Sequence, residues 1–185
     1  MKDETNSAFI LHPSSFILSS MSPYLVLPLL ILIALVQTTL LPIFIPGPVR
    51  PDLMLMVVVG WGVVHGNGQA ALWGLVGGLL LDLFSGAPFG LHALSLGGVG
   101  WLADTLQTNF FRSNLLIPLA TIFVASLLYH IGQAAVMQAL GFTINWAFYS
   151  FNVVMPTAIL NTVLMPLVYW ILRRLDRVVR PRLTW

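Results

Sequence analysis

Residues 148–172 read FYSFNVVMPTAILNTVLMPLVYWIL and contain no Asp, Glu, Lys or Arg. Tyrosine and tryptophan stand at both ends of this run, as Trp146 and Tyr149 at the first and Tyr169 and Trp170 at the second. A helix rises about 1.5 Å per residue, so Tyr149 to Tyr169 covers about 30 Å, the thickness of the hydrocarbon core of a bilayer. Aromatic residues gather at the two membrane interfaces. The run is therefore predicted to cross a membrane as a helix, with kinks at its prolines, Pro156 and Pro166.

The composition extends this prediction to the whole chain. Of 185 residues, 58% are hydrophobic and 8% are charged, whereas a soluble domain carries about 25% charged residues. Most charges stand near the termini, and between residues 23 and 172 there are only Arg50, Asp52, Asp82, Asp104 and Arg112. We therefore predict an all-α, polytopic integral membrane protein with almost nothing outside the bilayer.

The same composition excludes several classes of function. The chain has no cysteine, which excludes disulfides, thiolate catalysis and iron–sulfur sites. Its only lysine is Lys2, so no lysine follows a glycine-rich loop to reach a phosphate as in a P-loop. Five arginines lie in the last thirteen residues beside a hydrophobic segment, which is typical of a cytoplasmic membrane flank and not of a nucleic-acid site.

Five further apolar runs bring the predicted number of spans to six. They cover residues 24–44, 53–64, 70–84, 91–106 and 114–140. Read as one helix, residues 53–84 would measure nearly 50 Å, too long for one crossing, so we predict two short spans separated by His65-Gly66-Asn67-Gly68-Gln69. Residues 85–90 are predicted to form a turn and residues 109–113 a polar loop.

An even number of spans places both termini on one side of the membrane. With the termini inside, seven of the eight basic residues are cytoplasmic and only Arg50 is outside, as the positive-inside rule requires. We predict three parts: an N-terminal extension over 1–22, disordered or an over-long start, a six-helix membrane domain over 23–176, and a basic cytoplasmic tail over 177–185.

One helix face of the third span carries small residues that end in an acid. Ala70, Gly74, Gly78 and Asp82 recur every four residues, and we call them the small-residue stripe. Small residues let another helix approach closely in lipid, whereas a carboxylate there is costly unless it is partnered or near the interface. Helix packing, contact with a protein partner, and coupling to an ion or substrate are the three interpretations, in that order.

The other charged and histidine residues have simpler interpretations. Pro51 suits the first position of a helix and Asp52 its first turn, where exposed N–H groups favour a carboxylate, while Arg50 suggests a local pair or a partner contact. Asp104 is expected to pair with Arg112 at the cytoplasmic interface. No two histidines stand three or four residues apart, so the spacing of metal ligands is absent and no metal or other cofactor is predicted.

The segments Arg50-Pro51-Asp52-Leu53, 74–86 and 88–94 together resemble the MreD family, the small membrane subunit of the bacterial rod-shape system. The resemblance implies a non-enzymatic protein of the inner membrane that pairs with MreC, a single-span protein. Through MreC it would act with MreB, RodA and a penicillin-binding transpeptidase in peripheral cell-wall synthesis. It also implies a fold similar to the substrate-binding component of energy-coupling-factor transporters. The positions that carry over are Arg50, Pro51, Asp52, Gly78, Asp82, Gly86, Pro88, Gly90 and His92.

Two functions remain open from the sequence: a membrane scaffold subunit, and the substrate-binding component of a small-molecule transporter. A transporter should bring Asp52, Asp82, His92 or Asn161 together in a polar pocket that faces one side. A scaffold should keep its polar residues near the interfaces and expose a small-residue or apolar groove to lipid. An intramembrane enzyme is disfavoured because neither paired acids nor metal-ligand spacing is present.

Overall fold

The computed structural model describes residues 23–65, 68–110 and 116–179, and these residues are helical apart from short connections. No strand occurs in them, which confirms the all-α prediction. The elements are α1 (Pro23–Leu35), a π-helical turn (Val36–Leu40), α2 (Leu41–Phe44), α3 (Leu53–His65), α4 (Gln69–Ser85), α5 (Leu91–Phe110), α6 (Leu116–Ala139), α7 (Trp146–Tyr149), a second π-helical turn (Ser150–Val154) and α8 (Met155–Val179).

The connections explain where these helices stop. The predicted break after residue 64 is present: α3 ends at His65, and Gly68 precedes α4 with a φ of 74°. The predicted turn at 85–90 is also present, with Gly86 at φ 68° and Gly90 at φ 94°, a left-handed region that favours glycine. By contrast, α5 continues to Phe110, past the predicted end at residue 106 and into the predicted polar loop. The rest of that loop lies outside the described residues.

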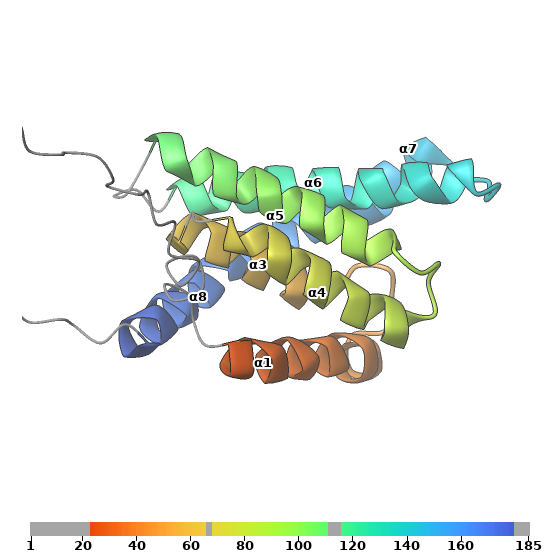
Figure 1. The fold of residues 1–185 in the computed structure, drawn as a ribbon. Coiled ribbons are helices and arrows are strands. Elements are labelled where there is room, and N and C mark those ends of the chain that lie inside the picture. The colour runs from red at the N-terminus through yellow and green to blue at the C-terminus, as the bar shows by residue number, and fades with distance from the viewer. Residues whose placement is uncertain (1–22, 66–67, 111–115, 180–185) are drawn as a thin grey trace, which may run out of the picture.

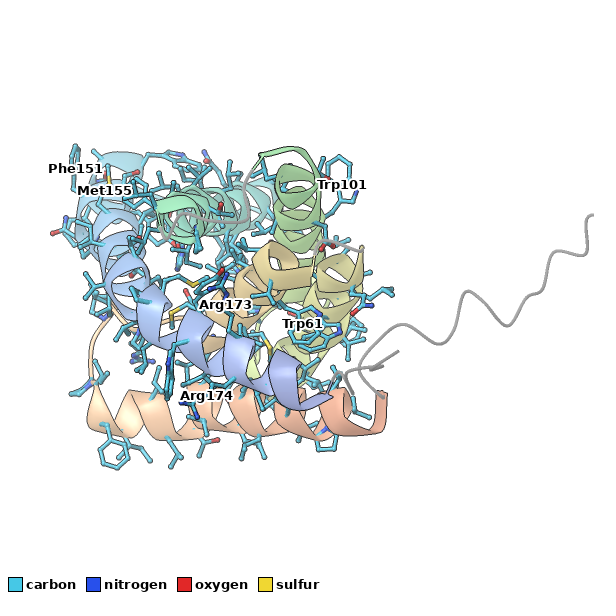
Figure 2. The ribbon with its side chains drawn as sticks, turned by 90° about the vertical axis from the view of Figure 1, so that its left-hand side faces the viewer. Trp61, Trp101, Phe151, Met155, Arg173 and Arg174 are labelled. Atoms are coloured by element: carbon cyan, nitrogen blue, oxygen red, sulfur yellow. The ribbon has the colours of Figure 1, made fainter. Side chains whose placement is uncertain are left out.

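Both π-helical turns lie just before a proline. Proline has no N–H, and its ring crowds the carbonyl four residues earlier, which is Thr38 for Pro42 and Asn152 for Pro156. Both of those residues lie inside the π-helical turns, where the wider backbone gives the ring room. The first and last helical segments therefore continue through their prolines, and Figure 2 shows α8 curving across the bundle.

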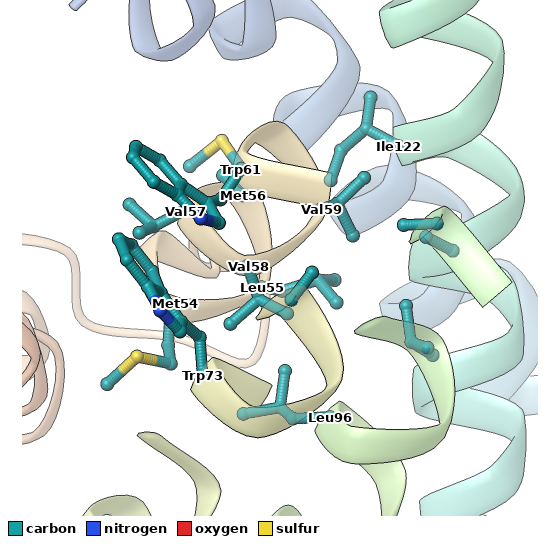
Figure 3. Close-up of a cluster of buried hydrophobic side chains, with 14 of the residues drawn as sticks. Met54, Leu55, Met56, Val57, Val58, Val59, Trp61, Trp73, Leu96 and Ile122 are labelled. Atoms are coloured by element: carbon teal, nitrogen blue, oxygen red, sulfur yellow. The ribbon is translucent and has the colours of Figure 1, made fainter. Parts of the chain in front are cut away.

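Helix α3 forms the centre of the core. It is apolar on every side, and all residues from Met54 to Gly62 are buried, as expected for a helix without a polar face. Figure 3 shows its side chains packed among those of α4, α5 and α6. Trp61 stacks on Trp73 of α4 with ring centroids 4.2 Å apart and an angle of 12° between the planes. A span too short for a bilayer is thus enclosed by protein neighbours.

The outside of the bundle is apolar, as a lipid-facing surface should be. Within the described ranges, three segments are long and apolar enough to cross a membrane, Val26–Phe44, Pro118–Ala139 and Trp146–Leu175, and two apolar helices are shorter, Leu53–Val64 and Gln69–Ser85. Large side chains such as Phe44, Phe151 and Val163 are mostly exposed. Figure 1 shows the start of α1 and the end of α8 on the same side of the bundle, with the α4–α5 and α6–α7 connections on the opposite side.

Candidate functional site

Asp82, the last member of the small-residue stripe, caps the neighbouring helix α5. Its Oδ2 accepts hydrogen bonds from the backbone N–H of Gly90 (2.9 Å) and Ala93 (3.2 Å). Its Oδ1 accepts from the backbone N–H of His92 (2.9 Å) and lies 2.8 Å from the His92 ring Nδ1. The first N–H groups of a helix have no partner within it and favour a negative charge. A carboxylate from α4 therefore satisfies the N-terminus of α5.

Asp104 does the same in the opposite direction. This residue of α5 is buried, and its Oδ2 accepts from the backbone N–H of Ala71 in the first turn of α4 (3.2 Å). Its Oδ1 is buried without a hydrogen-bond partner among the described residues. The expected partner Arg112 lies outside those residues. The antiparallel helices α4 and α5 thus each cap the start of the other.

The glycines of the stripe lie in the contact between these two helices. A Cβ on Gly74 would meet the backbone of Leu96 and Gly97, and one on Gly78 would meet the backbone of His92 and Ala93. Backbone cannot move aside as a flexible side chain can, so only glycine permits this approach. The glycines of the stripe therefore face α5, and this part of the stripe packs within the chain.

A second polar cluster surrounds Asp52, just before α3. Its carboxylate lies 3.0 Å from Nε2 of His130 and accepts from Nε2 of Gln37 (3.0 Å). The Gln37 Oε1 accepts from the backbone N–H of Met54 (2.8 Å). Its predicted place in the first turn suggested that the Asp52 side chain would cap its own helix. The carboxylate does not form that cap. It instead joins α3 to the π-helical turn after α1 and to α6.

Asn161 connects the same cluster to α8. Its Oδ1 accepts from the backbone N–H of Asp52 (2.9 Å), and its Nδ2 donates to Ser126 Oγ (3.0 Å). Nδ1 of His130 lies 2.8 Å from the Ser126 carbonyl oxygen. No role was predicted from the sequence for Gln37 or Ser126, and His130 was expected only to be a satisfied polar residue or an interface anchor. The available signal was that each is a polar side chain inside an apolar run, and such residues face the protein interior in membranes.

Two open clefts share His92 in their lining. The first has a volume of about 300 Å³, and its polar lining comprises Gln37, Thr38, Arg50, Asp52, Ser85 and His92. The second has a volume of about 320 Å³, and its polar lining comprises His92, Gln133 and Tyr149. The buried Nε2 of Gln133 has no hydrogen-bond partner among the described residues. The first cleft lies where α3 begins and α4 ends, and the second lies between the start of α5 and the last turns of α6. We call this end of the bundle the Asp52 end.

The remaining candidate residues lie at this end or in its turn. Arg50 donates from Nε to the carbonyl oxygen of Ile45 (3.1 Å), and Pro51 is buried beside it. Gly86, Pro88 and Gly90 form the turn between α4 and α5. In the part of the chain that the structure describes, no three His, Cys, Asp or Glu residues are placed to hold a metal ion. The Asp52 end thus gathers the candidate residues apart from Gly74, Gly78 and Asp104.

Comparison with known proteins agrees with the resemblance noted in the sequence. The family described as rod shape-determining protein MreD matches residues 19–179. No curated protein and no solved structure matches the chain, so the likeness to energy-coupling-factor components stays a prediction. Because the match covers most of its length, the chain belongs to the MreD family of rod shape-determining membrane proteins.

Proposed function

We propose that this MreD-family chain is a non-enzymatic scaffold subunit of the bacterial rod-shape machinery, paired with an MreC-like single-span protein. Through that partner it acts with MreB, RodA and a penicillin-binding transpeptidase to regulate peripheral peptidoglycan synthesis. It crosses the plasma membrane six times with both termini in the cytoplasm. The family match supports the role in cell shape.

One observation supports the scaffold role: the described chain consists almost entirely of helices, joined by short connections. Residues 45–52, 86–90 and 140–145 are short connections, and the rest of residues 23–65, 68–110 and 116–179 is almost wholly helical. The outer faces of these helices expose large apolar side chains. In lipid, helices associate through close packing and polar contacts, so lateral contact is the output that this architecture favours.

The geometry divides the candidate residues between two roles. Gly74, Gly78, Asp82 and Asp104 are engaged in the contact between α4 and α5, so we assign them to the fold and not to a partner. The turn between these helices remains for contact with a partner. Phe89 in that turn is 72% exposed, and it lies in segment 88–94, which carries part of the family resemblance.

Co-purification in mild detergent with the neighbouring MreC-like protein tests the proposal. We expect a stable complex, reduced by Phe89→Asp and unchanged by Phe142→Asp. Phe142 is the matched control, because it is 59% exposed in the α6–α7 connection at the same end of the bundle. Failure of the unaltered chain to recover the partner contradicts the pairing. Equal loss in both variants contradicts the role of the α4–α5 turn.

The transporter alternative has one observation in its favour. Asp52 and Asn161 are hydrogen-bonded together, and Asp52 and His92 line the same cleft. This is the convergence expected of a binding component, although most of these side chains are satisfied by one another. Tight one-to-one binding of a vitamin-sized molecule by the purified chain, without an MreC-like partner, would favour this alternative.

A further inference from the structure

We propose that the first cleft at the Asp52 end binds a phosphate group through Arg50 and His92. The phosphate belongs either to the headgroup of a membrane lipid or to free inorganic phosphate. This inference goes beyond the scaffold role and does not depend on an MreC-like partner.

Arg50 supplies the cation. Its Nε is held by the carbonyl oxygen of Ile45 (3.1 Å), which fixes the guanidinium at the cleft. No carboxylate among the described residues lies within 4.0 Å of it. The nearest acid along the chain is Asp52. One of its carboxylate oxygens accepts from Gln37, and the other pairs with His130. The two terminal nitrogens of Arg50 can therefore form a fork for an external anion, and a phosphate matches that geometry.

His92 supplies a second polar group that is already oriented. Its Nδ1 lies 2.8 Å from Oδ1 of Asp82, and its side chain is 17% exposed. A carboxylate at one ring nitrogen fixes the orientation of the ring and favours a proton on that nitrogen. The other nitrogen, Nε2, makes no hydrogen bond within the described residues. When the ring is protonated, Nε2 can donate to an anion in the cleft.

The rest of the lining suits a phosphate with an apolar attachment. Ser85 adds a hydroxyl. The apolar part of the cleft is formed by Leu41, Pro42, Pro51, Leu81 and Phe84. The cleft has a volume of about 300 Å³, which leaves room beside a phosphate for part of the group attached to it. The carboxylates nearest the phosphate position, Asp52 and Asp82, already accept hydrogen bonds on both oxygens, which lessens their repulsion of an anion.

Three probes separate the possible sources of the phosphate. The full chain, purified in an uncharged detergent, is titrated with dihexanoyl phosphatidylglycerol, with inorganic phosphate, and with dihexanoylglycerol, which lacks the phosphate. We expect saturable binding of the phosphatidylglycerol and none of the dihexanoylglycerol. Competition by inorganic phosphate identifies the free phosphate group as sufficient, and its absence identifies the lipid headgroup. Equal binding of the two lipids, or binding of neither phosphate probe, overturns the proposal.

Variants test the residues. Arg50→Gln should weaken phosphatidylglycerol binding about tenfold, as loss of a charged hydrogen-bond pair predicts. Arg50→Lys should weaken it less, and His92→Gln should weaken it severalfold. Arg173→Gln is the matched control, because Arg173 lies over the Tyr169 ring near the opposite end of the bundle. Thermal unfolding confirms that each variant is folded. Unchanged affinity in a folded Arg50→Gln variant, or an equal loss in Arg173→Gln, contradicts the proposal.

Discussion

At the scale of single residues, two carboxylates hold one helix pair together from opposite ends. Asp82 accepts from the start of α5, and Asp104 accepts from the start of α4. An acid inside a membrane protein is costly unless it is partnered, and here the partners are backbone N–H groups that otherwise also lack acceptors. Each carboxylate thus avoids two costs: that of an unpartnered acid on its own helix and that of N–H groups without acceptors on the other helix.

The Asp82 carboxylate should tolerate partial replacement better than complete replacement. Four donors converge on its two oxygens. Asn keeps one acceptor oxygen and Leu keeps none, and each buried donor left unpaired costs about 1–3 kcal/mol. We expect the melting temperature in detergent to fall in Asp82→Asn and to fall further in Asp82→Leu. Ser85→Ala, which changes an exposed hydroxyl one turn away, is the control. Equal melting temperatures for the Leu variant and the unaltered chain would show that the cap contributes nothing.

The small-residue stripe gives a second prediction, with its control on the facing helix. A Cβ on Gly78 meets the backbone of α5, whereas a Cβ on Gly98 meets nothing within 4 Å. Gly78→Ala should therefore destabilise the chain by about 1–3 kcal/mol through overpacking, and Gly78→Leu by more. Gly98→Ala should be neutral or stabilising by up to about 1 kcal/mol, because alanine favours a helix. Thermal unfolding of the three purified variants measures this. A Gly78→Leu variant as stable as Gly98→Ala contradicts the assigned contact.

For single residues, the sequence predicts which side chains share a helix face but not which groups they contact. The shared face of Gly74, Gly78 and Asp82 follows from their spacing alone, because residues four apart lie together on a helix. The donors to Asp82 could not be predicted, since they depend on how far α5 is shifted along α4. Asp52 shows the same limit: its partners Gln37 and His130 come from helices far along the chain.

At the scale of elements, the helices were predictable and their irregularities were not. Hydropathy and the glycines predicted the break between α3 and α4, because the apolar run over residues 53–84 is too long to be one span. The prolines predict an irregularity in the first and last helical segments. The π-helical turns that accommodate these prolines depend on the neighbouring helices and could not be predicted. The first of these turns carries Gln37, which accepts from Met54 and donates to Asp52. It therefore joins the peripheral first helix to the buried α3.

Replacing this glutamine should loosen α1 more than the rest of the bundle. Gln37→Leu leaves the Met54 N–H without its acceptor and removes one donor from Asp52, at a cost of about 1–3 kcal/mol for the unpaired buried group. We expect faster limited proteolysis near α1 in detergent and a lower melting temperature. Gln138→Leu is the control, since Gln138 is an exposed residue bonded to Trp146. An identical proteolysis pattern in both variants contradicts the anchoring role.

At the scale of the whole molecule, the two ends of the bundle differ in chemistry. The Asp52 end holds the two clefts and the Asp–His pairs. The other end carries Arg173 and Arg174, whose guanidinium groups lie over the rings of Tyr169 and Trp170 at 4.8 and 4.9 Å. Aromatic rings and arginines together are typical of a membrane interface, and basic residues favour the cytoplasmic one. We therefore expect the Asp52 end, with its clefts, to face away from the cytoplasm.

Orientation can be tested directly because the chain has no cysteine. In intact cells, a membrane-impermeant maleimide should label Thr143→Cys, which lies exposed in the α6–α7 connection at the Asp52 end. Thr184→Cys should be labelled only after the membrane is permeabilised, since the basic tail is predicted to be cytoplasmic. The reverse pattern means that the bundle is inverted and that the clefts open to the cytoplasm. Labelling of both in intact cells also contradicts the proposed topology, because residues 146–179 would then not separate Thr143 from the tail by a membrane.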